Sequence, residues 1–250
     1  MNRYFLEVSY HGGGFAGFQV QKNAITVQGE VEQAFATFFR RPVELTGSSR
    51  TDAGVHALQN YFHFDWEGDI DPKGIYNLNA ILPGAIVIKG LTLMHNGAHS
   101  RFDAVSREYK YFLYGRKNPF LDDRALYYPY TIDLRKMQEA AGRVMGHTDF
   151  SSFSKRNTQV KTFNCRIERS EWRWEGDCLV YNVLGNRFLR GMVRGLVATM
   201  LQVGRGKMDL EGFEGVIASK DNTRADFAVG GHGLFLVGVN YPAGYFGIGR

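Results

Sequence analysis

Hydrophobic and polar residues alternate along several short stretches of the chain, with the two-residue period that is typical of β-strands. The stretch YFLEVSY near the N-terminus and the stretch REYKYFLYG near the middle show this alternation clearly. A pair of strands joined by the turn EGD is indicated within residues 164–185. Besides this pair, the sequence predicts strands at 4–10, 43–47, 58–66, 84–94, 107–115 and 233–242.

Other stretches show the 3.6-residue period of amphipathic helices. Thr26 is placed to cap a helix over Val27–Phe39, and Pro42 follows the end of that helix. Shorter helical patterns occupy residues 72–82 and 133–146. The first helix would bury one apolar face, formed by Val27, Val31, Ala34, Phe35 and Phe38.

A further helix is predicted over residues 187–204, where a broad apolar stripe indicates burial. Arg187, Arg190 and Arg194 would lie along one edge of this stripe, because they are spaced three and four residues apart. Such arginines often cover a core with their aliphatic stems. Arg194 falls closest to the apolar side, and a nearly buried arginine requires an anionic partner.

Strands and helices follow one another in the order β-α-β-β-α-β roughly twice along the chain. This is the order of ferredoxin-like units, and no linker rich in Pro or Ser separates the two copies. We therefore expect an α+β fold of two pseudo-duplicated ferredoxin-like halves, residues 1–105 and 106–250. The sheet would be largely antiparallel, with helices on one side and a central cleft.

Composition limits the class of protein further. Hydrophobic residues make up 44% of the 250 residues, enough for a sizeable core, and no apolar run reaches 18 residues. The N-terminus lacks the apolar region of a secretion signal. The two cysteines, Cys165 and Cys178, form no CxxC pair and suit a reducing compartment. We expect a cytoplasmic protein without a membrane segment.

The formal net charge is +5, and its distribution is more informative than its size. No acidic residue occurs from Cys178 to Met208 or from Phe150 to Ile167. Basic runs are usually solvated faces, but two such stretches in one half of the chain also fit a surface that binds phosphates. Candidate RNA-binding residues within them are Arg187, Arg190, Arg205, Lys155 and Arg156.

Three familiar kinds of site find little support. The glycines of GGGFAG satisfy GxGxxG, but the next helix starts about nine residues too late for a dinucleotide site. His95 and His99 are four apart, yet they flank the turn-forming pair Asn-Gly, so metal ligation is not expected. No GxSxG motif is present. We expect neither a metal nor a cofactor.

The stretch GSSRTDAGVHAL contains a single carboxylate, Asp52. Its surroundings are good turn chemistry, so a purely structural role is the simplest local interpretation. Arg194 is a candidate partner for this carboxylate if the two halves face each other. Tyr109 and Tyr111 share one face of a predicted strand, where they could stack on bases or pack in a core.

Taken in order, many segments of the chain resemble the bacterial tRNA pseudouridine synthase A family. RTDAGVHA is the most specific match, and the resemblance spans nearly the whole chain. The other matching segments are YHGGGFAGFQVQ, TVQGEVEQAF, LPGAIVI, SRFDAVSREYKY, GHTDFSSFS, NRFLRGMVRGLVATMLQVGRGK and GLFLVGVNYP.

The resemblance implies that the protein isomerises uridine in tRNA at positions 38, 39 and 40, as a homodimer without cofactor. Asp52 would be the catalytic aspartate, paired with Arg194. Tyr109 would lie against the target base, Arg50 would help to hold the target nucleotide out of the helix, and Leu234 would line the pocket. The family's two ferredoxin-like halves, with the active cleft between them, agree with the fold expected above.

Three positions depart from the family's pattern: Ser49 replaces a glycine, Ala98 replaces a phenylalanine, and FAVGGH at 227–232 replaces Ala-Pro-Ala. These departures put substrate detail in doubt rather than reaction type. Two rival classes stay open at this point, a non-catalytic RNA-binding protein on the same scaffold and a nucleotide-binding enzyme that uses GGGFAG. Whether Asp52 attacks C1′, adds to C6 or removes a proton at C2′ is also open.

Overall fold

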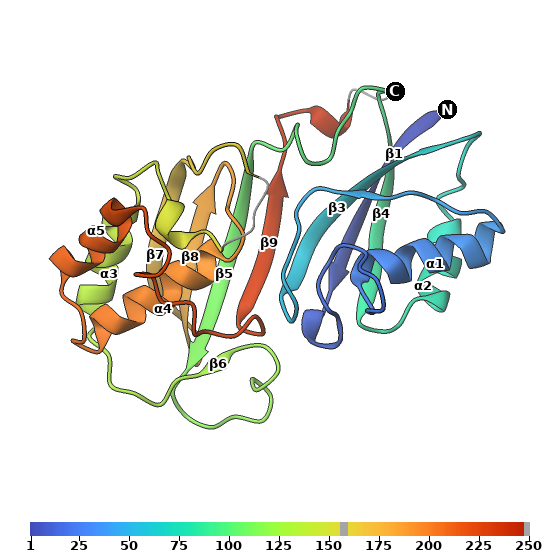
Figure 1. The fold of residues 1–250 in the computed structure, drawn as a ribbon. Coiled ribbons are helices and arrows are strands. Elements are labelled where there is room, and N and C mark those ends of the chain that lie inside the picture. The colour runs from blue at the N-terminus through green and yellow to red at the C-terminus, as the bar shows by residue number, and fades with distance from the viewer. Residues whose placement is uncertain (156–159, 248–250) are drawn as a thin grey trace. The chain divides into compact units, whose positions relative to one another are not determined.

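A computed structural model of the chain, which describes residues 1–155 and 160–247, shows two compact units (Figure 1). Unit 1 comprises Met1–Val105 together with the C-terminal segment that begins at Leu236. Unit 2 comprises Ser106–Phe235. The described residues form five α-helices and nine strands, and the strand pairs are mostly antiparallel. The predicted α+β class is therefore confirmed.

Unit 1 follows the predicted order of elements. Its strands are arranged β4-β1-β3-β9, with the short β2 paired to β3. Antiparallel register places Tyr4 opposite Phe64 on one side and Leu93 on the other. The elements are β1 (Asn2–Tyr10), α1 (Val27–Phe39), β2 (Thr46–Gly47), β3 (His56–Trp66), α2 (Gly74–Ile81), β4 (Ile86–Met94) and the part of β9 (Leu234–Asn240) from Leu236 onward.

Helix α1 forms where the sequence predicts it. The Thr26 side chain accepts a hydrogen bond from the backbone N–H of Gly29 at 3.2 Å, which satisfies one of the free N–H groups of the first turn. The helix ends at Arg40, whose left-handed backbone stops the repeat. Phe35 meets Phe64 of β3 edge-on at 5.3 Å, so the apolar face of α1 lies against the sheet (Figure 1).

Unit 2 combines a sheet with three helices that lie together on it (Figure 1). Its strand order is β9-β5-β8-β7, with β6 paired to β5. The predicted EGD turn joins β7 to β8, with Gly176 in the left-handed region. The elements are β5 (Ser106–Tyr114), β6 (Leu126–Tyr127), α3 (Leu134–Val144), β7 (Ile167–Glu175), β8 (Cys178–Gly185), α4 (Met192–Gly204), α5 (Leu210–Ser219) and the start of β9.

The predicted helix over 187–204 starts five residues too early. Helix α4 begins at Met192, because Gly191 has a φ of +78° and breaks the helical repeat before it. Arg187 and Arg190 therefore lie outside the helix, and the expected row of three arginines along its edge is wrong. Of these three, only Arg194 belongs to α4.

Helix α5 and the short strand β6 are additional to the sequence prediction, and the strand expected over 43–47 shortens to β2. Helix α5 is capped by Asp209, whose side chain accepts from the Gly212 N–H at 2.7 Å. It buries Phe213, Val216 and Ile217. None of the described helices has the length and apolar character that crossing a membrane requires.

Candidate active site

Asp52 lies in the loop that joins β2 to β3 in unit 1. Its carbonyl accepts a hydrogen bond from the Val55 N–H at 3.2 Å, which closes a turn, and Gly54 within that turn has a φ of +78°. The turn expected from the sequence is therefore present. The side chain of Asp52 is half-buried, so its carboxylate is held by a fixed backbone while it still reaches solvent.

The buried side-chain amide of Asn60 holds this loop through hydrogen bonds. The Asn60 side chain on β3 accepts from the Ser48 hydroxyl at 2.7 Å and donates to the Ser49 carbonyl at 2.9 Å. It also donates to the hydroxyl of Tyr10, which shares a 2.8 Å hydrogen bond with the hydroxyl of Thr51. Because Asn60 is fully buried, these bonds are protected from water. The residues on both sides of Arg50 are thus tied to the sheet.

The glycine-rich loop packs against the same segment. A Cβ atom on Gly12 would lie 2.0 Å from the Val55 carbonyl oxygen, and one on Gly17 would lie 3.0 Å from that of Thr51. The Gly12 N–H donates to Nδ1 of His56 at 3.0 Å. The glycines therefore allow close approach of two backbones. The dinucleotide interpretation fails, because α1 begins at Val27 and not at the third glycine.

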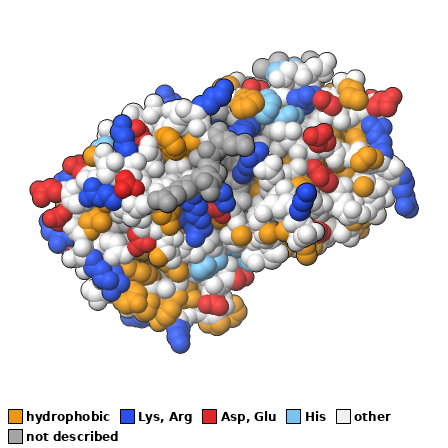
Figure 2. Space-filling view, in the orientation of Figure 1, with side chains coloured by type: hydrophobic (Ala, Val, Ile, Leu, Met, Phe, Trp, Pro, Cys, Tyr) orange, Lys and Arg blue, Asp and Glu red, His pale blue; other side chains and the backbone are white. Residues whose placement is uncertain are grey.

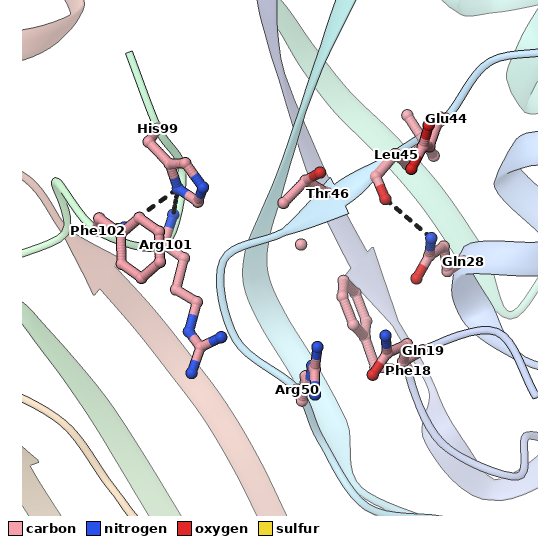
Figure 3. Close-up of a pocket in the computed structure, with 11 residues that line it drawn as sticks. Phe18, Gln19, Gln28, Glu44, Leu45, Thr46, Arg50, His99, Arg101 and Phe102 are labelled. Carbon is pink, nitrogen blue, oxygen red and sulfur yellow. Dashed lines mark hydrogen bonds between the residues drawn. The ribbon is translucent and has the colours of Figure 1, made fainter. Parts of the chain in front are cut away.

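Arg50 is exposed and borders a cavity of about 270 Å³, which we call the Arg50 pocket. Figure 3 shows Arg101 and Phe102 on one wall of the pocket, and Glu44 and Leu45 on the opposite wall. All residues that line this pocket belong to unit 1. They are Phe18, Gln19, Gln28, Glu44, Leu45, Thr46, Gly47, Arg50, His99, Arg101 and Phe102.

In unit 2, Tyr109 lies on β5 opposite Val183 of β8 and is largely buried. Its ring meets Phe188 edge-on, with the ring centres 5.1 Å apart. Tyr111, two residues further along, is completely buried and donates its hydroxyl hydrogen to the Gly230 carbonyl. The two tyrosines therefore occupy the packed part of the strand, and Tyr109 is the one with slight exposure.

Arg194 occupies the first turn of α4 and is half-buried. Its Nε and Nη2 atoms donate to the Val229 carbonyl at 2.8 and 2.6 Å. Burial raises the pKa of the Tyr111 hydroxyl, and the nearby charge of Arg194 opposes that rise. Leu234 is buried and is the first residue of β9, five residues after Val229.

The candidate RNA-binding residues of unit 2 lie near α4. The Lys155 N–H donates to the Arg190 carbonyl at 3.0 Å, and its aliphatic stem packs over Gly191. Arg187 lies near the Cys165 thiol, whose pKa burial raises to about 11 while the arginine opposes that rise. Arg205 stacks over the Tyr130 ring at 4.1 Å. Arg156 lies outside the described residues. On the face of the molecule drawn in Figure 2, Lys and Arg side chains are interspersed with acidic ones.

The described residues include no group of three or more His, Cys, Asp or Glu side chains that could hold a metal ion. His95 and His99 do not share a helix, because the His95 carbonyl accepts from the Ala98 N–H in a turn. His63 is bound to Ser100 at 2.8 Å. Of these histidines, His63 is buried in unit 1, whereas His95 is exposed.

Comparison with known proteins places the chain. A sequence model of the tRNA pseudouridine synthase family matches residues 140–242. The tRNA pseudouridine synthases A of Parabacteroides distasonis and Bacteroides thetaiotaomicron are 44% and 42% identical to it, over 98% of this chain and 98% and 93% of theirs. That of Francisella tularensis subsp. holarctica is 34% identical over 97% of this chain and 95% of its own. The chain belongs to the tRNA pseudouridine synthase A family.

At each of the three departures from the family's sequence pattern, a backbone carbonyl accepts a hydrogen bond. The carbonyl of Ser49 accepts from Asn60, that of Ala98 accepts from Arg3 at 2.7 Å, and that of Val229 accepts from Arg194. A backbone carbonyl is present whatever the side chain. These three hydrogen bonds therefore do not depend on which side chain occupies the departing positions.

The predicted site residues are divided between the two units. Asp52 and Arg50 share one loop of unit 1, whereas Tyr109, Arg194 and Leu234 belong to unit 2. The pairing of Asp52 with Arg194 stays a prediction from the sequence. Sequence reasoning missed Asn60, whose only signal is a polar residue amid the hydrophobic strand LQNYFHFDW.

Proposed function

We propose that the chain converts uridine to pseudouridine in tRNA, and its similarity over 98% of its length to a tRNA pseudouridine synthase A carries this proposal. The reaction breaks the bond from ribose C1′ to uracil N1 and joins C1′ to C5, and C5 loses its proton while N1 gains one. Substrate and product are isomers, so the reaction consumes no redox equivalent. It requires only groups that can detach, hold and rejoin the base.

Asp52 is the proposed catalytic residue. An ionised carboxylate can attack carbon or take a proton, and Asp52 is the only acid in its loop. Attack at C1′, addition to C6 and proton removal at C2′ are all consistent with a carboxylate. Arg194 is the proposed partner, because guanidinium is always charged and a nearby positive charge favours the ionised carboxylate.

The remaining site residues are proposed to handle the base. A uridine stacked in a helix is out of reach, so it must be flipped before reaction. Arg50, exposed beside Asp52, would hold the flipped nucleotide. Tyr109 and Leu234 would contact the uracil while it turns. These roles rest on family membership and on the burial of both side chains at the strands that carry them.

Basic residues of unit 2 would bind the tRNA backbone. Each phosphate neutralised releases counterions, so binding would weaken steeply as salt is raised. Lys155 and Arg190 lie side by side through their backbone bond and are the strongest pair of candidates. Arg187, Arg205 and Arg156 complete the proposed surface, and the family implies uridines 38, 39 and 40 of the anticodon arm as targets.

The proposal extends to the duplication of the fold, the cellular location and the oligomeric state. Unit 1 follows the order β-α-β-β-α-β, and unit 2 follows it with β6 and α5 added, which supports two duplicated ferredoxin-like units. A tRNA substrate supports a cytoplasmic site of action. A homodimer is proposed from the family alone, and sedimentation as a monomer would refute it.

The direct experiment maps pseudouridine in tRNA from a bacterium deleted for its own synthase of this family, with and without a plasmid that encodes this chain. We expect the chain to restore pseudouridine at positions 38–40, detected by carbodiimide labelling and primer extension. A chain that binds tRNA and restores no modification would instead be a non-catalytic RNA-binding protein on the same scaffold.

A further inference from the structure

The Arg50 pocket is bordered by an aromatic side chain that is mostly exposed to solvent. Phe102 is 73% exposed, and it lies between β4 and β5 in the segment His99–Asp103. Its neighbour Arg101 is also exposed, with its guanidinium 5.7 Å from the centre of the Phe102 ring. Large apolar side chains in such positions are common singly, but this one borders a cavity together with two arginines.

The exposed ring is held in place by the histidine beneath it. Nδ1 of His99 accepts hydrogen bonds from the N–H groups of Arg101 and Phe102, at 3.1 and 3.3 Å. The imidazole also packs on one face of the Phe102 ring, with the centres 4.1 Å apart. Because Nδ1 accepts both bonds, the imidazole is neutral with its hydrogen on Nε2. Burial and nearby positive charge lower the pKa of His99 and favour that form.

A second layer of hydrogen bonds supports His99. Its own N–H donates to the Asp103 carboxylate at 2.8 Å, and Tyr245 donates its hydroxyl hydrogen to the same oxygen at 2.5 Å. The His63 ring packs against His99 at 4.4 Å. Three segments of unit 1 therefore combine to hold the Phe102 ring and the backbone of Arg101, so little side-chain entropy of Phe102 would be lost on binding.

The charges around the pocket are unequal. Figure 3 shows Arg101 beside Phe102 on one wall, Arg50 at one end of the pocket near Phe18 and Gln19, and Glu44 on the far wall. A phosphate is attracted to the arginine side and repelled by Glu44, so a ligand would enter in one orientation. An aromatic ring accepts the flat face of any base, and an exposed arginine accepts the phosphate beside it.

We propose that the Arg50 pocket binds one unstacked nucleotide of the tRNA next to the target uridine, with its base on Phe102 and its phosphate between Arg101 and Arg50. This inference rests on the proposed function, because it names a subsite of the same substrate. Arg50 precedes Asp52 by two residues in the same loop, so the proposed subsite borders the loop that carries the proposed catalytic carboxylate. The subsite keeps the strand unstacked on one side of the flipped uridine.

The test replaces Phe102 and measures binding and turnover on an unmodified tRNA transcript. Stacking of one base contributes enough that Phe102→Ala should weaken Kd about 5- to 150-fold. KM should rise in parallel and kcat should stay within about twofold, measured by release of tritium from uracil C5. Phe102→Tyr should bind like the wild type, whereas Phe102→Leu should resemble Phe102→Ala, because only the aromatic ring stacks.

Phe120→Ala is the matched control, since Phe120 is 81% exposed in unit 2, between β5 and β6. Arg101→Gln should lower the slope of log K against log salt by about one. The subsite is overturned if Phe102→Ala binds like Phe120→Ala, if Phe102→Leu binds like the wild type, or if kcat alone falls. Wild-type protein that makes no pseudouridine would overturn the proposed function instead.

Discussion

Single buried polar side chains determine the shape of the proposed catalytic loop. Asn60 belongs to no signature motif, yet it bonds Ser48, Ser49 and Tyr10 and so fixes the chain on both sides of Arg50. A strand pattern marks Asn60 only as a polar residue at a position of unknown orientation. Its partners could not be predicted, because they depend on the register between β1 and β3.

His63 offers a test of burial in unit 1 through pH. Burial lowers the pKa of His63 to about 4, and the neighbouring His99 and the positive charge of Arg3 lower it further. The unfolded chain binds this proton at its ordinary pKa of about 6.5. The folded state therefore keeps its full advantage above pH 6.5 and loses it progressively as pH falls to 4.

His63→Asn keeps an acceptor for the Ser100 N–H and removes the titration. The free energy of unfolding of the wild type should fall by about 1–2 kcal/mol more than that of His63→Asn between pH 7 and 4.5, measured by urea unfolding. His95→Asn, at an exposed histidine, is the control and should follow the wild type. Parallel pH profiles for wild type and His63→Asn would contradict the account.

At the scale of elements, the glycine-rich loop contains a GxGxxG pattern but lacks the helix start that dinucleotide binding needs. The sequence predicted a loop that allows close approach of backbones, and the structure identifies the partner as the segment 51–55. The sequence could not name that partner, since residues 12–17 and 51–55 are far apart along the chain.

This contact predicts an effect on catalysis without a change in any site residue. In Gly12→Ala the new methyl group would overlap the Val55 carbonyl, so the Asp52 turn must shift. A displacement of about 1 Å costs about 100-fold in rate, and we expect a loss of that order in kcat, with Kd for tRNA within about threefold. Gly14→Ala is the control, because a Cβ there meets nothing within 4 Å. Equal kcat values for the two folded variants would contradict this role.

The helices of unit 2 show where periodicity fails. Apolar spacing continues through RFLRG, so the pattern extends the helix to Arg187, but Gly191 adopts a left-handed backbone that the pattern cannot reveal. Helix α5 escaped prediction because LEGFEGVIAS contains two glycines, which lower helix propensity. Its Asp209 cap and its apolar residues three and four apart were the available signal.

At the scale of the whole molecule, the sequence supplied the family, the α+β class and most element positions. The matched segments run in order along both units, which is why a linear pattern was sufficient. The spatial relation of the proposed site residues could not be predicted from the sequence in the same way. Asp52 belongs to unit 1, and Tyr109 and Arg194 belong to unit 2, so their joint action is inferred from family membership and chemistry.

The central claim is that Asp52 performs the chemistry, and Asp52→Asn tests it most directly. The substitution keeps the shape of the side chain and removes its charge, while phosphate contacts that supply most of the affinity stay in place. We measure single-turnover pseudouridine formation on saturating enzyme, together with Kd for tRNA. The account predicts binding within about threefold of the wild type and no detectable pseudouridine. A rate within about tenfold of the wild type, a loss of only about 1.4 kcal/mol, would contradict it and leave Asp52 as a turn residue.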